Sequence, residues 1–145
     1  MKLTVIIDPA GEEEIILRVR EHGETENKIR ELIGSGNSRI VGYGEREILP
    51  LDASAVSAFF VEKGRTYASL RGERLRVDLR IYELEQMLGR DFVKVNQSCL
   101  INVSHIEKFD ASFSGALVVI TKDGVRECVS RRQLKAVKER IGFKL

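Results

Sequence analysis

The stretch DFVKVNQSCLINVSHIEKF, residues 91 to 109, mixes an apolar pattern with many hydrogen-bonding side chains. The apolar residues would contribute to a core: Phe92, Val93, Val95, Cys99, Leu100, Ile101, Val103 and Ile106. Polar residues are interspersed among them: Lys94, Asn96, Gln97, Ser98, Asn102 and His105. Amine, amide and hydroxyl groups can hold a turn together or hydrogen-bond to a polar partner. This stretch is therefore the first place to look for a functional site.

Residue patterns that could support catalysis are scarce. The two histidines, His22 and His105, lie far apart and lack the spacing of a zinc-binding pair. We expect His22 in an exposed turn and His105 in a structural position at the start of a strand. The sequence has no Gly-x-Ser-x-Gly motif and no glycine-rich phosphate-binding loop. We therefore expect no catalytic residue, no metal and no cofactor, and an enzyme ranks third among the function classes.

Composition predicts one ordinary folded domain with a small attachment. The chain has 145 residues, of which 43% are hydrophobic, and no apolar run approaches the roughly 20 residues of a membrane helix. The amino-terminal apolar run is short and ends at Asp8 and Pro9, so we expect a soluble cytoplasmic protein without a signal peptide. Its two cysteines, Cys99 and Cys128, lie in apolar-rich segments, and we interpret both as reduced core residues.

Charge is distributed unevenly along the chain. Residues 1–50 contain 7 Lys and Arg against 10 Asp and Glu, a net charge of −3, whereas residues 51–145 contain 17 against 12, a net charge of +5. A basic surface on the second part favours a polyanionic partner, although an excess of this size also occurs on ordinary solvated surfaces.

The first 36 residues predict a small β-β-α unit. Residues 2–7 and 13–21 have strand-like patterns, and residues 25–34 form a helix with Thr25 as N-cap and Gly34 as terminator. Such a unit is too small to bury a good core alone. It must pack either on a second copy of the chain or on its own second part. Residues 34–38, GSGNS, are the expected boundary.

From residue 39 onward the sequence predicts a mainly β domain. Short segments rich in β-branched or aromatic residues are separated by Gly, Pro or charged turns. The predicted strands are 39–44, 46–52, 56–63, 65–72, 74–79, 91–96, 105–110, 116–121 and 125–130. Asp123 and Gly124 predict a tight hairpin between the last two strands.

Two short helices are predicted within this domain. The first has apolar residues at helical spacing, Ile81, Leu84 and Leu88, and ends at Gly89. The second begins after Ser130, a suitable N-cap, and turns three apolar residues inward: Leu134, Val137 and Ile141.

The ordered set of motifs resembles the LytTR family of bacterial DNA-binding domains. The residues that carry the resemblance are FFVEKGRTYASL, ELEQML, FVKVNQSCLIN followed by HIEKF, and VSRRQLKAVK. It covers residues 40–145. The resemblance implies an elongated arrangement of small antiparallel sheets with two short helices, which reads DNA from loops and not from a helix-turn-helix. With the first unit added, the expected fold is mainly β, preceded by a β-β-α extension.

The resemblance also implies roles for the polar residues of the opening stretch. Lys94 and Gln97 match positions that face DNA; Asn96 stands where the family usually has histidine, and Gln97 where it commonly has arginine or asparagine. Asn and Gln can pair with adenine through two hydrogen bonds, whereas Arg prefers guanine. The alternative is that Asn96 and Gln97 only cap the turn after the strand. Ser98 and Asn102 are interpreted as structural residues that hold the turn.

Two further segments match DNA-facing positions of the family. Arg132 matches an arginine that reads a base at the start of the last helix, and Arg131 is its neighbour. Two arginines at a helix N-terminus oppose the helix dipole, which a phosphate or guanine partner would explain; an ordinary surface ion pair is the alternative. Arg65 and Tyr67 match a third segment, although a strand tyrosine is as often a packing residue.

The expected function is transcription regulation by sequence-specific binding of double-stranded DNA, as a homodimer on repeated half-sites. The first unit would serve in dimerisation or signal input, and it is too short for a phosphate-receiving domain. Family members of this length resemble regulators that a membrane protein holds in check. The rival is a protein-interaction module whose basic β surface binds an acidic partner, although a chain without Trp offers little hot-spot material.

Overall fold

The computed structural model describes residues 2–34, 40–113 and 115–144. The chain divides into two compact units, Met1–Ser38 and Arg39–Leu145. Most of the predicted boundary, residues 35–38, lies outside the described residues. No helix in the described part of the chain is long and apolar enough to cross a membrane.

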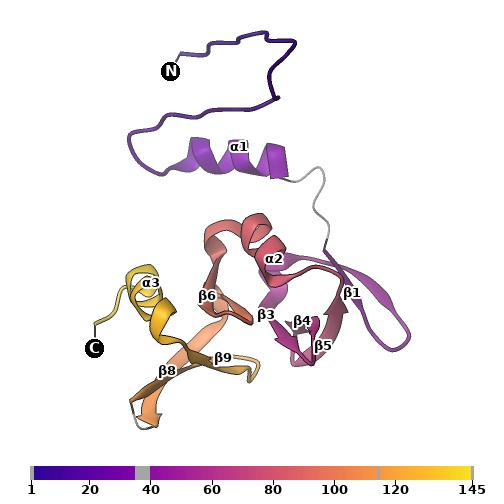
Figure 1. Cartoon of the computed structure of the whole chain (residues 1–145), viewed down its shortest axis with the longest axis vertical. Coiled ribbons are helices and arrows are strands. Elements are labelled where there is room, and N and C mark those ends of the chain that lie inside the picture. The colour runs from indigo at the N-terminus through magenta and orange to yellow at the C-terminus, as the bar shows by residue number, and fades with distance from the viewer. Residues whose placement is uncertain (1, 35–39, 114, 145) are drawn as a thin grey trace. The chain divides into compact units, whose positions relative to one another are not determined.

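The first unit has one regular element, the helix α1 (Glu24–Gly34), and the two strands predicted before it are not formed. Residues 2–23 instead follow an irregular path that reverses at a turn, where the Gly11 amide donates to the Asp8 carbonyl at 3.2 Å (Figure 1). Pro9 fixes its φ near −65°, which excludes the positive φ of the two-residue turns that suit a hairpin. The two segments that flank the turn form no strands in the described chain.

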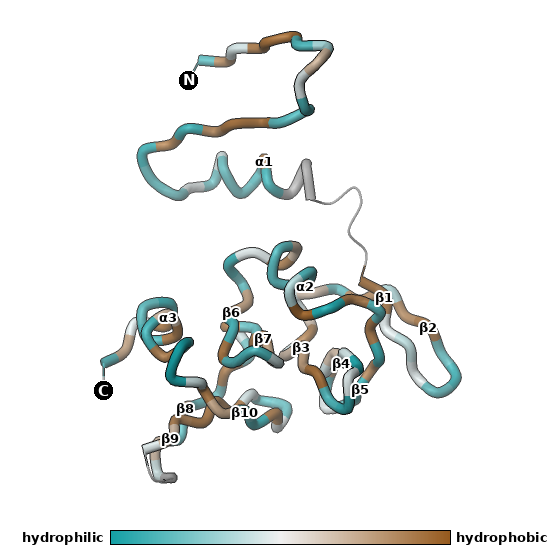
Figure 2. Tube along the Cα trace, in the orientation of Figure 1, coloured by the Kyte–Doolittle hydropathy of each residue, from teal (hydrophilic) through white to brown (hydrophobic). Residues whose placement is uncertain are grey.

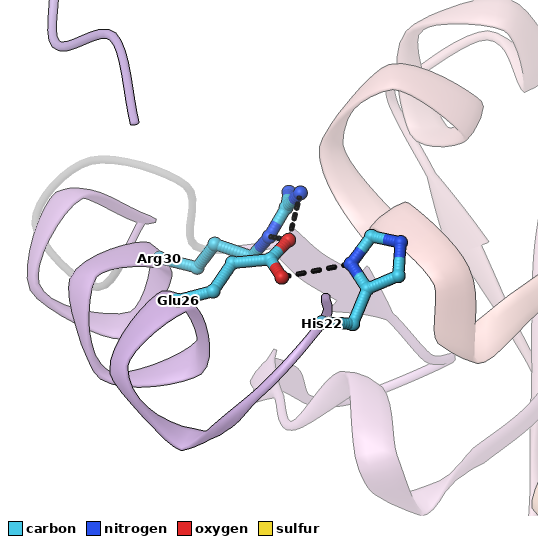
Figure 3. Close-up of polar contacts among 3 residues, drawn as sticks. All are labelled: His22, Glu26 and Arg30. Atoms are coloured by element: carbon cyan, nitrogen blue, oxygen red, sulfur yellow. Dashed lines mark hydrogen bonds and ion pairs between the residues drawn. The ribbon is translucent and has the colours of Figure 1, made fainter. Parts of the chain in front are cut away.

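Helix α1 begins one residue earlier than predicted, so Thr25 lies inside its first turn and is not the N-cap. Glu26 is buried and is the centre of a polar group at this end (Figure 3). Its carboxylate contacts Nδ1 of the exposed His22 at 2.7 Å and accepts two hydrogen bonds from Arg30, at 2.8 and 3.1 Å. The Arg30 guanidinium and the His22 ring hold the pKa of Glu26 below its usual value.

The second unit confirms the mainly β prediction. Its elements are β1 (Ile40–Tyr43), β2 (Ile48–Leu51), β3 (Val56–Glu62), β4 (Arg65–Leu70), β5 (Glu73–Val77), α2 (Ile81–Leu88), β6 (Phe92–Asn96), β7 (Cys99–Asn102), β8 (Ile106–Phe113), β9 (Ala116–Thr121), β10 (Arg126–Val129) and α3 (Arg131–Ile141). Every predicted strand and helix of this unit is present. Only β7 was missed, because all of its residues are buried and it lacks the alternation that indicates a strand.

The strands form two antiparallel sheets. The larger has seven strands in the order β2-β1-β5-β4-β3-β7-β6, and the smaller has three in the order β10-β9-β8. Each sheet is built mainly from hairpins between consecutive strands, so the contacts are local in sequence. This is the expected arrangement of small sheets with two short helices.

The large sheet is buried on both faces because alternate residues point to opposite sides. One face, with Phe59 and Leu100, packs against α2 through Leu84. On the other face, Ala58, Val95, Cys99 and Ile101 pack with Val119 of β9 and Val137 of α3. In Figure 2, brown apolar segments of the large sheet, β9 and α3 converge at this second core.

One carboxylate in the β9–β10 turn joins the two sheets. Asp123 accepts hydrogen bonds from the buried hydroxyls of Ser57 and Ser69, at 2.8 and 2.9 Å, and from the Gly72 amide at 3.3 Å. Within its own turn, Thr121 donates to it at 2.5 Å. Burial by itself would raise the pKa of Asp123, but these hydrogen bonds outweigh it and lower the pKa.

Replacement of Asp123 by alanine should lower the free energy of unfolding by about 2 kcal/mol, because two buried hydroxyls lose their acceptor. Urea unfolding measures the effect. Asp110→Ala is the matched control. Among the described residues that carboxylate accepts from Ser112 of its own strand alone, and its removal should change stability by less than about 0.5 kcal/mol. Equal losses in the two variants would contradict the role of Asp123 between the sheets.

The lowered pKa makes this contribution depend on pH. The folded-state pKa lies below the usual 3.8, so the stabilisation is complete above that value and is lost as the pH falls through the folded pKa. The difference in unfolding free energy between the natural chain and Asp123→Asn should therefore be constant near neutral pH and shrink at acid pH.

Candidate nucleic-acid interface

The β6–β7 turn presents Gln97 at its tip. The Asn96 side-chain oxygen accepts a hydrogen bond from the Ser98 amide at 2.8 Å, which closes the turn. The Ser98 carbonyl accepts from the Val61 amide of β3 at 2.8 Å, so the turn is also attached to the neighbouring strand. Ser98 is structural as predicted, but it acts through its backbone. Gln97 is exposed.

The end of β6 is joined to the chain that leads into α3. The Asn96 side-chain nitrogen donates to the Cys128 carbonyl at 2.9 Å and to the Glu127 carboxylate at 3.1 Å. Beside it, the Ser130 amide donates to the Val95 carbonyl at 2.9 Å. These bonds bring the first turn of α3 next to the β6–β7 turn, and α3 lies beside β6 in Figure 1. The amide of Asn96 is thus occupied by bonds within the chain.

The first turn of α3 carries Arg131 and Arg132, both exposed. Ser130 is the N-cap, as predicted, and its hydroxyl accepts from the Gln133 amide at 3.3 Å. In the described part of the chain, neither arginine forms an ion pair with an acidic side chain. Two cations without acidic partners at the positive end of a helix leave an electrostatic cost that a bound anion would remove.

The β3–β4 turn extends from the same end of the sheet. Lys63 and Gly64 both have positive φ, 51° and 75°, which is the two-residue turn that suits a hairpin. Phe60 pairs with Cys99 across β3 and β7, so this turn and the Gln97 turn project in the same direction. Arg65 follows the turn and is exposed. Sequence reasoning missed Lys63, although a Lys-Gly pair between two strands was the available signal.

Together these segments define a basic edge, made of Lys63, Arg65, Gln97, Arg131 and Arg132. Three stretches far apart in the sequence contribute to it, and each is fixed by backbone hydrogen bonds to the large sheet or to β6. The side chains offer guanidinium, amine and amide donors, which are the groups that contact phosphates and base edges of DNA.

Two predicted site residues lie apart from the basic edge. Lys94 is half-buried, and its Nζ lies 3.6 Å from the Glu85 carboxylate of α2. It faces the α2 side, as Phe92 does two residues earlier, whereas Val93 and Val95 face the second core. The Tyr67 ring stacks on the Phe60 ring, with 5.9 Å between the two ring centroids. The Arg74 guanidinium lies over the Tyr67 ring, 4.6 Å from its centroid. The ring of Tyr67 is therefore engaged in packing within the sheet.

Asn102 and His105 have structural roles, as predicted. Asn102 is buried, donates to the Val56 carbonyl at 3.0 Å, and accepts from the Ser104 amide at 3.1 Å, so it fixes the turn after β7 and not the one before it. His105 contacts the Ser54 carbonyl through Nε2 at 2.8 Å.

Cys99 is a buried free thiol whose pKa is raised by burial, in agreement with the sequence interpretation. Cys128 is exposed, which corrects that interpretation: β10 is an edge strand, and alternate residues of an edge strand face solvent.

Comparison with known proteins identifies the family. The model of the LytTr DNA-binding domain matches residues 46–142. A solved LytTr DNA-binding domain from Bacillus cereus superposes with a TM-score of 0.66 at 18% identity, covering 74% of this chain and all of that one. The fold and the family match together confirm the resemblance: the chain belongs to the LytTR family of DNA-binding domains. Such a domain indicates a transcription regulator and not an enzyme.

Relatives agree in length as well as in sequence. A protein of Staphylococcus aureus strain NCTC 8325, named an HTH-type transcriptional regulator, is 30% identical over 148 residues, which is 99% of each chain. A second, from the bovine strain RF122, is 34% identical over 104 residues, or 72% of this chain and 71% of the relative. In the described part of this chain, five strands separate α2 from α3, so these two helices form no helix-turn-helix.

The two neighbouring amides of the β6–β7 turn should respond differently to substitution. Asn96→Ala should lower the free energy of unfolding by about 1–2 kcal/mol, because the Ser98 amide and the Cys128 carbonyl lose their partner. Gln97→Ala should leave stability within about 0.5 kcal/mol of the natural chain and weaken only DNA binding. Thermal unfolding and DNA titration of both variants test this. An Asn96→Ala variant as stable as the natural chain would show that the Asn96 hydrogen bonds do not hold the turn.

Proposed function

We propose that this chain regulates transcription by reading a specific duplex DNA sequence with the basic edge. The observation that supports this is the convergence of three fixed segments. Arg65, Arg131 and Arg132 are all exposed, and none of them has an acidic partner among the described residues. A rigid surface with several cations suits the regular spacing of DNA phosphates, and side chains at its centre can reach base edges in the major groove.

The proposed roles differ along the edge. Arg132 reads guanine and Gln97 reads adenine, because each can form two hydrogen bonds with its base. Lys63, Arg65 and Arg131 contact phosphates. Lys94 lies outside the edge, on the α2 side, and its phosphate contact is proposed from the family resemblance; it requires the amine to leave Glu85. Asn96 and Tyr67 hold neighbouring residues in place and do not contact DNA themselves. The Asn96 amide is already hydrogen-bonded within the chain, and the Tyr67 ring is already stacked on Phe60.

The rival reading, a module that docks an acidic protein partner, has less support. Protein interfaces depend on exposed aromatic and apolar anchors. The aromatic residues near the basic edge, Phe60 and Tyr67, stack on each other and on Arg74 instead of projecting outward.

We further propose that the regulator is a bacterial cytoplasmic homodimer that binds two half-sites. The first unit serves dimerisation or signal input and does not touch DNA, because residues 1–50 carry a net charge of −3 and phosphates would repel it. A membrane protein that restrains the regulator is proposed from the family resemblance alone.

Arg132→Ala should weaken binding to the specific site by about 1–3 kcal/mol and leave binding to random DNA nearly unchanged, as expected of a base-reading arginine. Lys94→Ala should weaken both alike. A site selected from random duplex DNA supplies the probe, and exposed Lys144, outside the edge, provides the control Lys144→Ala. Full discrimination between sites in a folded Arg132→Ala variant would remove the base-reading role.

Binding should weaken steeply as salt rises, because each phosphate contact releases counterions. In a plot of the logarithm of affinity against that of salt concentration, Lys63→Ala should reduce the slope by about 1. Lys28→Ala, in α1, should leave the slope unchanged. A flat dependence for the natural chain would favour the interaction-module reading.

A further inference from the structure

Residues 12–20, EEEIILRVR, form neither helix nor strand, and several of their apolar side chains are exposed. Ile15, Ile16 and Val19 are 68%, 71% and 42% exposed. Figure 1 shows the segment as a drawn-out trace before α1, and Figure 2 shows its centre as an apolar run between hydrophilic ends. Within residues 2–23, the Gly11–Asp8 bond is the one backbone hydrogen bond, so the polar backbone here is unpaired as well.

In an extended β conformation, residues 12–20 would have two distinct faces, because successive side chains point to opposite sides. Ile15, Leu17 and Val19 fall on one face, which is apolar apart from its first residue, Glu13. The opposite face has Ile16 at its centre and is otherwise charged, with two acidic residues before Ile16 and two basic residues after it. The sequence is β-prone and amphipathic, yet the described residues of the first unit contain no strand to pair with it.

The charges make the segment complementary to itself. Antiparallel pairing of two copies about Ile16 sets Glu12 opposite Arg20, Glu14 opposite Arg18, and Ile15 opposite Leu17. Opposite charges in directly facing positions stabilise an antiparallel pair, and like charges destabilise it. Parallel pairing in register would place every charge opposite its own copy. A shift by two residues in either direction along the antiparallel pair would keep only one kind of charge pair, Glu12 with Arg18 or Glu14 with Arg20, and would set a charged residue opposite Ile16.

We propose that residues 12–20 of two chains pair as antiparallel strands about Ile16 and form the homodimer interface. Such a contact is two-fold symmetric and closed, so it stops at two copies. The turn at Asp8–Gly11 reverses the chain, so residues 2–7, which form no strand in the single chain, can add one to each copy once residues 12–20 are paired. Such an addition matters because a two-stranded ribbon alone is only marginally stable. The dimer stands on its own observations; its use in DNA binding rests on the proposed function.

Charge reversal tests the pairing directly. The acid-reversed variant, Glu12→Arg with Glu14→Arg, and the base-reversed variant, Arg18→Glu with Arg20→Glu, should each be monomeric, because every facing pair then repels. An equal mixture of the two should form a heterodimer, since arginines of one chain then face glutamates of the other. Light scattering of the full chain after size-exclusion chromatography measures the mass.

Two outcomes would overturn the proposal. One is a natural chain that stays monomeric at the highest concentration it tolerates, and the other is a mixture that fails to associate although both variants are folded. Glu45→Arg with Glu47→Arg is the matched control, because it changes the charge equally at exposed positions of the β1–β2 turn. It should remain dimeric.

Cysteine crosslinking tests the register. In a Cys128→Ser background, Ile16→Cys should form a disulfide between copies, because position 16 faces itself. Val19→Cys should not, because the two cysteines would lie about 20 Å apart along the strands, far beyond the roughly 7 Å between Cα atoms that a disulfide spans. Crosslinking at position 19 but not at 16 would exclude this register.

DNA titration separates the failure of this interface from failure of the proposed function. The base-reversed variant should bind a single half-site as the natural chain does but lose the gain from paired half-sites. The four-fold variant that combines both reversals restores every ion pair at unchanged net charge, and it should recover that gain. If the four-fold variant dimerises but does not bind DNA, the proposed function is wrong and the interface stands. If monomeric variants still bind paired half-sites tightly, the interface is wrong and the DNA-binding function stands.

Discussion

The arrangement of the basic edge depends on the hydrogen bonds that join the end of β6 to the chain entering α3. The Ser130 amide donates to the Val95 carbonyl, and the Asn96 side-chain amide donates to the Cys128 carbonyl. These two hydrogen bonds set where the first turn of α3 begins. The net contribution of such a hydrogen bond to stability is small, because water can replace the partner at an exposed site, so these bonds fix position more than they add stability. A loop that reads DNA needs such fixing, because it lacks the intrinsic rigidity of a recognition helix.

A second constraint acts between the sheets. The smaller sheet leads directly into α3 through β10, so any movement of the small sheet would carry Arg131 and Arg132 with it. Asp123 opposes that movement by binding donors on β3, β4 and the β4–β5 turn. The apolar contacts of Val119 and Val137 with the large sheet complete the junction. Polar bonds here define geometry, while the apolar core provides most of the stability.

Much of the second unit could be predicted from the sequence because its signals are local. Alternating apolar residues, glycine turns and the Ser130 cap each indicate an element without knowledge of the rest. The strand β7 could not be predicted, since burial on both faces removes alternation. The opposite placement of Lys94 and Asn96 arises from a register shift in β6, which depends on pairing with β7. The predicted strands of residues 2–7 and 13–21 have the right composition, but they form no strand in the described chain, because composition does not specify which segment would pair with them.

The exposure of Cys128 has a practical consequence. Of the two thiols in the chain, Cys99 is buried and held in its protonated form, which leaves Cys128 as the reactive sulfur. The Cys128 backbone carbonyl accepts a hydrogen bond from the Asn96 side-chain amide, so Cys128 lies next to the turn that carries Gln97. A fluorescent or spin label attached there would report the surroundings of that turn from a single chemically addressable position, in the natural sequence and without any engineered residue.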